Sequence, residues 1–396
     1  MKKYKKPNFF VYGLFKLISK FLSKFVFNLK VVRNETKGVK DSYVIIANHE
    51  SAIDFIALAA ASKRRVNFVI SNSFYQSLPI NPLLTACGVI PKQQFQTTIS
   101  DMRKMKQVVD NERVLAIYPA GMMTEDGVST PIPLSTGKFA KWMDKDVYIA
   151  KIKGSYLTSP KWSGVRRKGK MELDIYKLFS KEDLAQLDSE KIFQIINEHL
   201  NYNAYSDQEE RKIEYTNGNN IRGLENVLYK CPKCKKEFVM KASSDDKITC
   251  SVCGYEVKSD KYGFLSSNHE SINYRYPSDW SKYIYNSLKE EIDNNPNYEL
   301  KSNAKISMID YKKHKFVHVG DAQVTLNLKE FVLDGNIKGE RINETYSVNT
   351  FPILPFSPGK YFEFQNGNDI YRIYLEKGVE VMKWINTIKI IYQKNR

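Results

Sequence analysis

The stretch YVIIANHESAID, residues 43–54, places a histidine and an aspartate directly after a short apolar run. Residues 43–47 predict a buried β-strand, and residues 54–61 predict a helix. His49 therefore leaves the carboxyl end of a strand, where open α/β sheets place ligands. A neutral imidazole accepts a proton near neutral pH, and a carboxylate on its other nitrogen fixes the tautomer. We interpret His49 as a general base that is oriented by Asp54.

The other four histidines provide an internal comparison for this spacing. Five places after His199, His269, His314 and His318 stand Ala204, Tyr274, Val319 and Gln323, none of which is an acid. His269 even lies in a second Asn-His-Glu-Ser, but no apolar run precedes it. His49 alone combines strand, spacing and acid. The alternative interpretation is a histidine that caps a helix beside an incidental aspartate.

Short apolar runs and helical stretches alternate around this segment. Further strands are predicted at residues 66–70, 114–118 and 147–152, and helices at residues 99–109 and 191–200. Strands separated by helices indicate βαβ units and a mostly parallel sheet. The fold class predicted for residues 40–205 is therefore α/β. Residues 206–228 are interpreted as a linker with a short helix.

The order of the motifs resembles that of the PlsC-like lysophospholipid acyltransferases, in the glycerolipid acyltransferase superfamily. Residues 48–54 resemble the family block Asn-His-x-Ser-x-x-Asp, residues 88–91 (GVIP) the second block, residues 114–121 (VLAIYPAG) the third, and residues 148–156 the fourth. Residues 126–140 resemble the stretch that leads into the next helix. The resemblance covers about residues 40–205.

This resemblance implies an O-acyltransferase similar to 1-acylglycerol-3-phosphate acyltransferases. It implies transfer of a fatty acyl group to the hydroxyl of a lysophospholipid or related glycerolipid acceptor. The donor would be acyl carrier protein, acyl-coenzyme A or an acyl phosphate. In the family the histidine deprotonates the hydroxyl and the aspartate supports it, without a covalent acyl-enzyme. These roles fall on His49 and Asp54.

Two blocks depart from the family pattern. The glutamate of the third block is Ala120, and its Thr-Arg pair falls on Met122 and Met123. The Asp-Arg pair of the second block is replaced by Gln93 and Gln94. Arginine binds phosphate bidentately and methionine cannot. The acceptor is then either not lysophosphatidic acid, or it is held by other basic residues.

Other basic residues are available in the sequence for a phosphate. The candidates are Lys92, Arg103 and the cluster Arg166, Arg167 and Lys168, which is alternatively a solvated turn. The substrate-binding residues that we predict are Lys92, Arg103, Tyr118, Pro119, Gly121, Arg166 and Arg167. The altered third block also leaves a rival function, a catalytically weakened membrane adaptor or scaffold derived from an acyltransferase.

The positive charge of the chain is concentrated at its beginning. The net charge is +17, and Glu35 is the only acid among residues 1–40. Lys16, Lys20 and Lys24 recur every fourth residue in an apolar segment, which predicts a helix with a cationic stripe. Three central lysines disfavour a spanning helix. No Ala-x-Ala site follows, so no signal peptide is expected.

We therefore predict that residues 1–32 form a basic amphipathic helix on an anionic membrane surface. The alternative is a helix that packs on its own domain. The expected location is peripheral, at the cytoplasmic side of the cell membrane.

Four of the five cysteines lie in two Cys-x-x-Cys pairs within residues 229–262. Such knuckles aim thiolates at one ion, so Cys231, Cys234, Cys250 and Cys253 predict a structural Zn²⁺ site that resembles a zinc ribbon. Iron is the alternative metal. Mixed charges near the knuckles argue against nucleic acid as a partner. The fifth cysteine, Cys87, is interpreted as a buried core residue.

Residues 279–396 change to a pattern of one helix followed by β-strands. The helix is predicted at residues 279–293, and strands from about residue 298. Asn366-Gly367 predicts a tight turn between strands at residues 361–364 and 371–375. A final helix is predicted at residues 379–392. Strands closed by one helix resemble a pleckstrin-homology or GRAM-like module.

Overall fold

The computed structural model describes residues 6–93, 98–218, 220–352, 354–366 and 369–395. The chain divides into two compact units. The first contains residues 1–161 and 165–217, and the second contains residues 162–164 and 218–396. Gln94 and Gly367, which entered the predictions above, lie outside the described residues.

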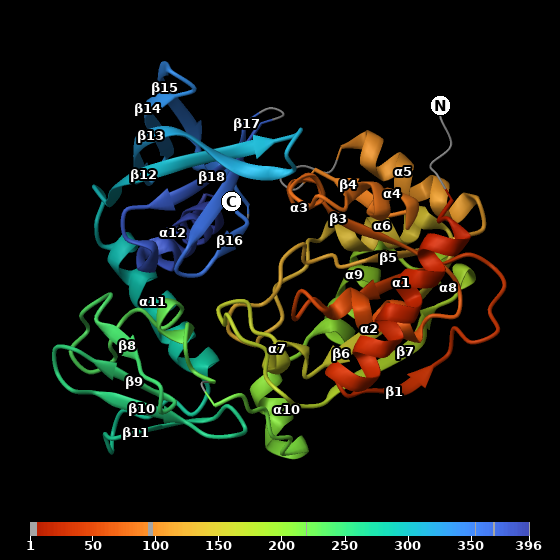
Figure 1. Ribbon diagram of the computed structural model, residues 1–396, viewed down its shortest axis with the longest axis horizontal. Coiled ribbons are helices and arrows are strands. Elements are labelled where there is room, and N and C mark those ends of the chain that lie inside the picture. The colour runs from red at the N-terminus through yellow and green to blue at the C-terminus, as the bar shows by residue number, and fades with distance from the viewer. Residues whose placement is uncertain (1–5, 94–97, 219, 353, 367–368, 396) are drawn as a thin grey trace. The chain divides into compact units, whose positions relative to one another are not determined.

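A seven-stranded sheet forms the centre of the first unit, with the order β1-β7-β6-β2-β5-β3-β4 (Figure 1). The strands are β1 (Leu29–Asn34), β2 (Tyr43–Ala47), β3 (Val66–Ser71), β4 (Ile90–Lys92), β5 (Val114–Ile117), β6 (Asp146–Lys153) and β7 (Met171–Phe179). β6 and β7 pair antiparallel, and the other described pairings of this sheet are parallel. The predicted α/β class with a mostly parallel sheet is confirmed for this unit.

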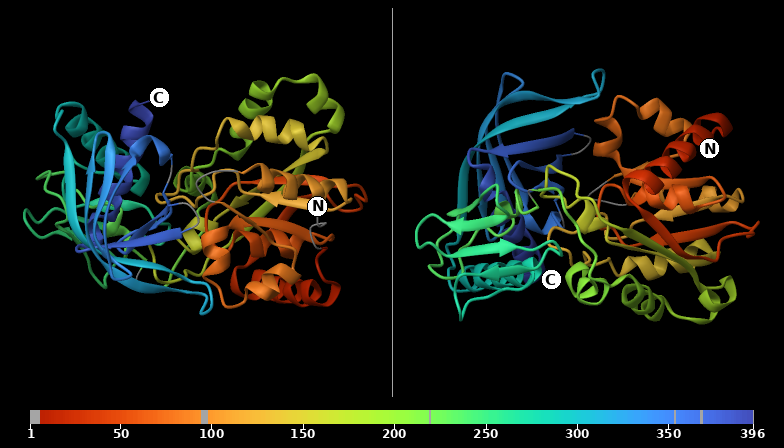
Figure 2. Two further views of the ribbon diagram at one scale, coloured as in Figure 1. Left: turned by 90° about the horizontal axis from the view of Figure 1, so that it is seen from above. Right: turned by 60° about the horizontal axis from the view of Figure 1, so that its bottom comes forward.

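Helices cover both faces of this sheet (Figure 2, left). The helices of this unit are α1 (Phe9–Phe21), α2 (Asp54–Ala61), α3 (Asn72–Gln76), α4 (Asn81–Ala86), α5 (Ile99–Asp110), α6 (Ser135–Met143), α7 (Ser155–Thr158), α8 (Lys181–Gln186), α9 (Ser189–Leu200) and α10 (Ala204–Arg211). Val44 and Ile46 of β2 pack with α5, α6, α8 and α9. The alternate residues Tyr43, Ile45 and Ala47 pack with α2 and the N-terminal helix. β2 is buried along its whole length because both of its faces are covered.

The N-terminal helix is shorter than predicted. α1 continues into a π-helical turn at Leu22–Val26, and Asn28 then adopts a positive φ of 47°. Leu29–Asn34 forms β1, which pairs with β7 at one edge of the sheet. The expectation of a helix through residue 32 is therefore wrong for residues 29–32. Val31 and Val32 are β-branched and favour an extended backbone once β7 offers a partner.

α1 presents different faces to the first unit and to solvent. Tyr12, Ser19 and Ser23 are buried, and the Tyr12 hydroxyl accepts a hydrogen bond from the backbone N–H of Val66 at 2.8 Å. Seven large apolar side chains of α1 and the π-helical turn are exposed, and we call them the exposed apolar face: Phe9, Phe10, Leu14, Leu17, Ile18, Phe21 and Phe25. Within the described residues, no helix is both long enough and apolar enough to cross a membrane.

The second unit contains two antiparallel sheets. The smaller has the order β11-β10-β9-β8 and consists of β8 (Met240–Ala242), β9 (Lys247–Cys250), β10 (Glu256–Ser259) and β11 (Leu265–Ser267). The larger has the order β15-β14-β13-β12-β18-β17-β16. Its strands are β12 (Glu299–Asp310), β13 (Lys315–Asn327), β14 (Glu330–Ile337), β15 (Glu340–Ser347), β16 (Phe356–Ser357), β17 (Tyr361–Asn366) and β18 (Asp369–Leu375).

Two helices accompany these sheets, α11 (Pro277–Asp293) and α12 (Val381–Lys394). Trp384 of α12 contacts the rings of Phe331 and Phe362 on the larger sheet. The predicted β-rich C-terminal region with a terminal helix is confirmed. Its likeness to a pleckstrin-homology or GRAM module, and that of the smaller sheet to a zinc ribbon, stay predictions.

Candidate functional site

His49 and Asp54 lie in contact where β2 gives way to α2. The Nδ1 atom of His49 is 2.9 Å from Oδ2 of Asp54. The Asp54 side chain is completely buried, whereas 23% of the His49 side chain is exposed. Because Nδ1 faces the carboxylate, Nε2 is the ring nitrogen left to accept a proton from a bound molecule. The strand end supplies the histidine, and the first turn of the following helix supplies the acid.

Three further hydrogen bonds hold the Asp54 carboxylate in place. The backbone N–H groups of Glu50 and Ser51 donate to its Oδ2 at 2.8 and 2.9 Å. The hydroxyl of Ser155, just after β6, donates to Oδ1. These donors restrict the orientation of the carboxyl group, so it meets the imidazole in a fixed position.

Residues from neighbouring strands complete the surroundings of His49. The ring of Tyr118, which follows β5, lies with its centroid 4.6 Å from that of the imidazole. The backbone N–H of Thr124 donates to the carbonyl of His49 at 3.2 Å. The Asn48 side chain accepts from the N–H of Ile152 in β6 and donates to its carbonyl, both at 2.8 Å. The carboxyl ends of the parallel strands β2, β5 and β6 therefore meet at this site.

A pocket of about 220 Å³ opens beside His49. Its polar lining consists of Asn48, His49, Ser129, Thr130, Asn197 and Asn201, and its apolar lining of Ala47, Ala120, Pro131, Ile132 and Leu200. Asn197, Leu200 and Asn201 belong to the last turn and the end of α9. The pocket is smaller than the sites that hold a whole drug-sized ligand. It therefore suits a small polar group rather than an entire lipid.

Glu50 is a fully buried acid next to this pocket. Its Oε1 accepts from the Asn48 amide at 3.0 Å and from the Ser129 hydroxyl at 3.4 Å, while Oε2 has no partner among the described residues. Burial, and next the charge of Asp54, raise the pKa of Glu50 well above its ordinary value.

The predicted substrate-binding residues divide into two groups. Tyr118 contacts His49, and Pro119 and Gly121 flank Ala120, which lines the pocket. The four predicted basic residues do not line the pocket. Lys92 donates to the carbonyl of Gln93 at 3.2 Å, and Arg103 is exposed on α5. Arg166 donates to the carbonyl of Val26, and the buried Arg167 donates to the carbonyl of Leu157 at 3.3 Å. Their predicted role in phosphate binding stays a prediction.

Sequence reasoning missed several residues of this site. Ser155 carries a usable signal, because a Gly-Ser pair at residues 154–155 follows a predicted strand of the same sheet. Gly154 has a φ of 75°, and a Cβ there would lie 2.5 Å from the carbonyl oxygen of Lys170. Asn197 and Asn201 show no comparable signal, since they look like ordinary polar residues at the end of a helix.

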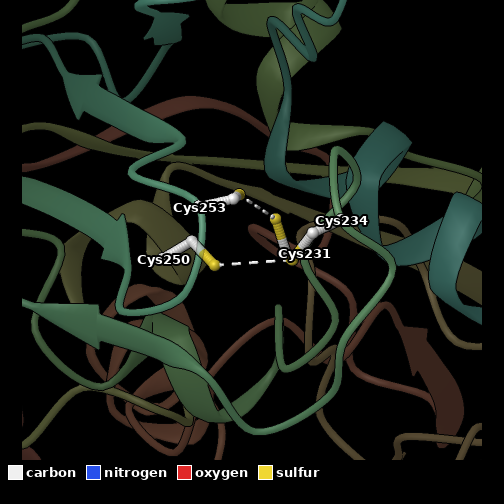
Figure 3. Close-up of side chains that lie close together, drawn as sticks. All are labelled: Cys231, Cys234, Cys250 and Cys253. Atoms are coloured by element: carbon white, nitrogen blue, oxygen red, sulfur yellow. Dashed lines mark hydrogen bonds between the residues drawn. The ribbon is translucent and has the colours of Figure 1, made fainter.

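The four paired cysteines of the second unit form one cluster (Figure 3). The Sγ atoms of Cys231 and Cys253 are 3.6 Å apart, and those of Cys234 and Cys250 are 3.7 Å apart. A disulfide would require about 2.05 Å. Tetrahedral zinc with Zn–S bonds of about 2.3 Å gives sulfur–sulfur edges of about 3.8 Å. The cluster therefore fits a four-thiolate metal site.

Known proteins show similarity to this chain, and the matched family model lies within the first unit. Residues 28–152 match the family model described as Acyltransferase. The 1-acyl-sn-glycerol-3-phosphate acyltransferase of Saccharomyces cerevisiae is 26% identical over 171 residues, which are 40% of this chain and 54% of the yeast protein. The chain thus spans about half the length of this curated relative.

A solved structure is also similar. It is the 1-acyl-sn-glycerophosphate acyltransferase PlsC of Thermotoga maritima, with 17% sequence identity and a TM-score of 0.43. The similarity covers 52% of this chain and 82% of the Thermotoga chain.

Proposed function

We propose that the first unit transfers a fatty acyl group to the hydroxyl of a lysophospholipid or related glycerolipid. His49 Nε2 takes the hydroxyl proton while the acceptor oxygen attacks the acyl carbon of the donor. The new ester C–O bond forms, and the C–S bond of a thioester, or the C–O bond of an acyl phosphate, breaks. The proton then passes from His49 to the leaving group, so no covalent acyl-enzyme is needed.

The His49–Asp54 contact is the observation that carries this proposal. A buried, fixed carboxylate supports the imidazolium that forms when His49 accepts the proton. The family match over residues 28–152 includes both residues. The alternative function, a catalytically weakened membrane adaptor or scaffold, is not favoured, because binding partners does not require a histidine–aspartate pair beside a pocket.

Direct assay tests the proposal. The purified chain is incubated with palmitoyl-coenzyme A, palmitoyl-acyl carrier protein or palmitoyl phosphate and a panel of monoacyl acceptors, and the products are identified by mass spectrometry. We expect a diacyl product from at least one donor. Hydrolysis of every donor without acyl transfer would refute the proposal.

We also propose that α1 holds the protein on an anionic membrane surface at the cytoplasmic side of the cell membrane. The exposed apolar face gathers seven large side chains that the unit itself leaves in solvent. Lys20 and Lys24 are exposed on the same helical segment and suit anionic headgroups. An apolar face flanked by cations is typical of helices that lie in the membrane interface.

Substituting the exposed apolar face tests this membrane contact. The double variant Phe10→Asp/Phe21→Asp is expected to bind anionic vesicles at least about tenfold more weakly, since it removes buried apolar area and adds repulsion. Both positions are exposed, so the fold should persist. The control Tyr311→Asp alters an exposed aromatic residue of the second unit and should bind as before. Equal vesicle flotation of the double variant and the parent would contradict the proposal.

For the second unit we propose a structural Zn²⁺ held by Cys231, Cys234, Cys250 and Cys253. The four thiolates fill a tetrahedral shell and leave no position for water or substrate. The region around this cluster is tied to the rest of the unit, because Trp280 of α11 donates to the carbonyl of Lys230 at 2.9 Å. Lys383 of α12 also forms an ion pair with Glu237 at 2.7 Å. The metal would therefore order both helices as well as the small sheet.

A further inference from the structure

The pocket beside His49 has an unusual electrostatic character for a site that accepts a lipid headgroup. Among the described residues, its lining contains no lysine or arginine. Besides His49, its polar groups are three amides and two hydroxyls: Asn48, Asn197, Asn201, Ser129 and Thr130. Such groups hydrogen-bond to alcohols. They do not supply the charge-assisted bonds that normally hold a phosphate.

The helix that borders the pocket points its negative end toward it. Asn197, Leu200 and Asn201 form the last turn and end of α9, where backbone carbonyls carry the negative end of the helix dipole. The carbonyl of Leu200 already accepts from the Ser129 hydroxyl at 3.1 Å. A helix carboxyl end favours donors such as hydroxyl groups and disfavours anions.

The charged groups near the pocket do not make it more favourable for an anion. The Asp54 carboxyl group contacts His49, but it is completely buried and does not line the pocket. The ammonium of Lys151 donates to the backbone carbonyl of Asn201 at 3.0 Å, but Lys151 itself does not line the pocket. Glu50 lies buried against the pocket residues Asn48 and Ser129. A phosphate bound here would face a helix carboxyl end without a lining cation.

We propose that this pocket binds an uncharged polyhydroxyl headgroup, such as glycerol or a sugar, of the acyl acceptor. The proposal rests on the proposed acyl transfer and specifies its acceptor. One hydroxyl of the headgroup gives its proton to His49 Nε2 and attacks the acyl carbon, while the remaining hydroxyls bond to the amides and hydroxyls of the lining. The volume of about 220 Å³ admits such a group and leaves the acyl chain outside.

Competing acceptors with one acyl chain test the proposal. The full-length chain is assayed with each donor and with 1-palmitoylglycerol, 1-palmitoyl-3-glucosylglycerol, lysophosphatidic acid and lysophosphatidylethanolamine, each alongside the His49→Ala variant. We expect kcat/KM for an uncharged acceptor to exceed that for lysophosphatidic acid at least about tenfold. A His49-dependent preference for either phosphate-bearing acceptor overturns the headgroup assignment and leaves the proposed acyl transfer intact. The absence of His49-dependent transfer to all four acceptors overturns both.

A variant with a positive charge in the pocket lining tests the headgroup assignment independently. Asn197 is exposed on the last turn of α9, so Asn197→Lys adds a cation at the pocket without filling the core. We expect its ratio of lysophosphatidic acid to 1-palmitoylglycerol turnover to rise about fivefold or more, as for one partly screened charge pair. Glu198→Gln makes the same change in net charge at an exposed position outside the lining and should leave this ratio unaltered. An equal rise in both variants, or no rise in Asn197→Lys, contradicts the assignment.

Discussion

Replacing His49 with alanine is expected to lower the rate of acyl transfer at least about a thousandfold, the scale of a lost general base. The imidazole contacts Asp54, and His49 lines the pocket, where no other described side chain of the lining can act as a base in its place. The side chain is 23% exposed and His49 lines the pocket, so its truncation enlarges an open pocket rather than creating a closed cavity. The measurement is product formation under single-donor conditions, with thermal unfolding monitored by circular dichroism.

Asp54→Asn tests the supporting role of the acid. We expect a loss of about a hundredfold or more, because an amide no longer stabilises the imidazolium. This variant should also be less stable, since Asp54 is buried and accepts from two backbone N–H groups and a hydroxyl.

His269→Ala is the matched control for both variants. His269 occupies a second Asn-His-Glu-Ser tetrapeptide in the second unit, without an acid five places later. Its replacement should leave transfer unchanged. Full activity of His49→Ala, or equal losses in His49→Ala and His269→Ala, would remove the general base from the mechanism.

Removal of the metal is expected to unfold much of the second unit. Structural zinc sites contribute about 10 kcal/mol or more to folding, which is comparable with the whole stability of an ordinary domain. Trp280 is anchored to the carbonyl of Lys230 beside the first knuckle, so the loss of the site should release α11. The measurements are zinc content, expected at one ion per chain, and tryptophan fluorescence during titration with a strong chelator.

Single cysteine substitutions distinguish the loss of the metal from the loss of any one thiol. Cys231→Ser should lose the metal and give the fluorescence of the chelated protein. Cys87→Ser changes a buried cysteine of the first unit and should retain one zinc per chain. A reductively purified protein that contains no metal, and that does not respond to the chelator, would disprove the site.

The local part of each site was predictable because covalent spacing brings its residues together. His49 and Asp54 are five residues apart across one strand-to-helix turn, and the structure places Nδ1 and Oδ2 2.9 Å apart. Each Cys-x-x-Cys knuckle is equally local. Strands β2, β3, β5 and β6 were predicted because their apolar runs are short and continuous, as buried parallel strands require.

Segments with mixed patterns were harder to predict. Residues 29–32 of β1 were predicted as the end of a helix. β1 is mostly exposed, and it lacks the continuous apolar run that marks the buried central strands. The assignment of a strand to Leu29–Asn34 depends on pairing with β7, which lies more than a hundred residues later. The composition of α1 indicated an amphipathic helix, but it did not reveal which face packs on the unit.

Sequence alone singled out the histidine and the acid proposed for proton transfer, the four cysteines proposed to hold a metal, and the α/β class, because each depends on spacing within a turn or on the period of one element. Only the tertiary structure decided what surrounds them. Ser155, Ser129, Asn197 and Asn201 are brought to Asp54, Glu50 and the pocket by sheet order and by the docking of α9. The raised pKa of Glu50 likewise follows from complete burial, which is a property of the packed chain and not of any short segment.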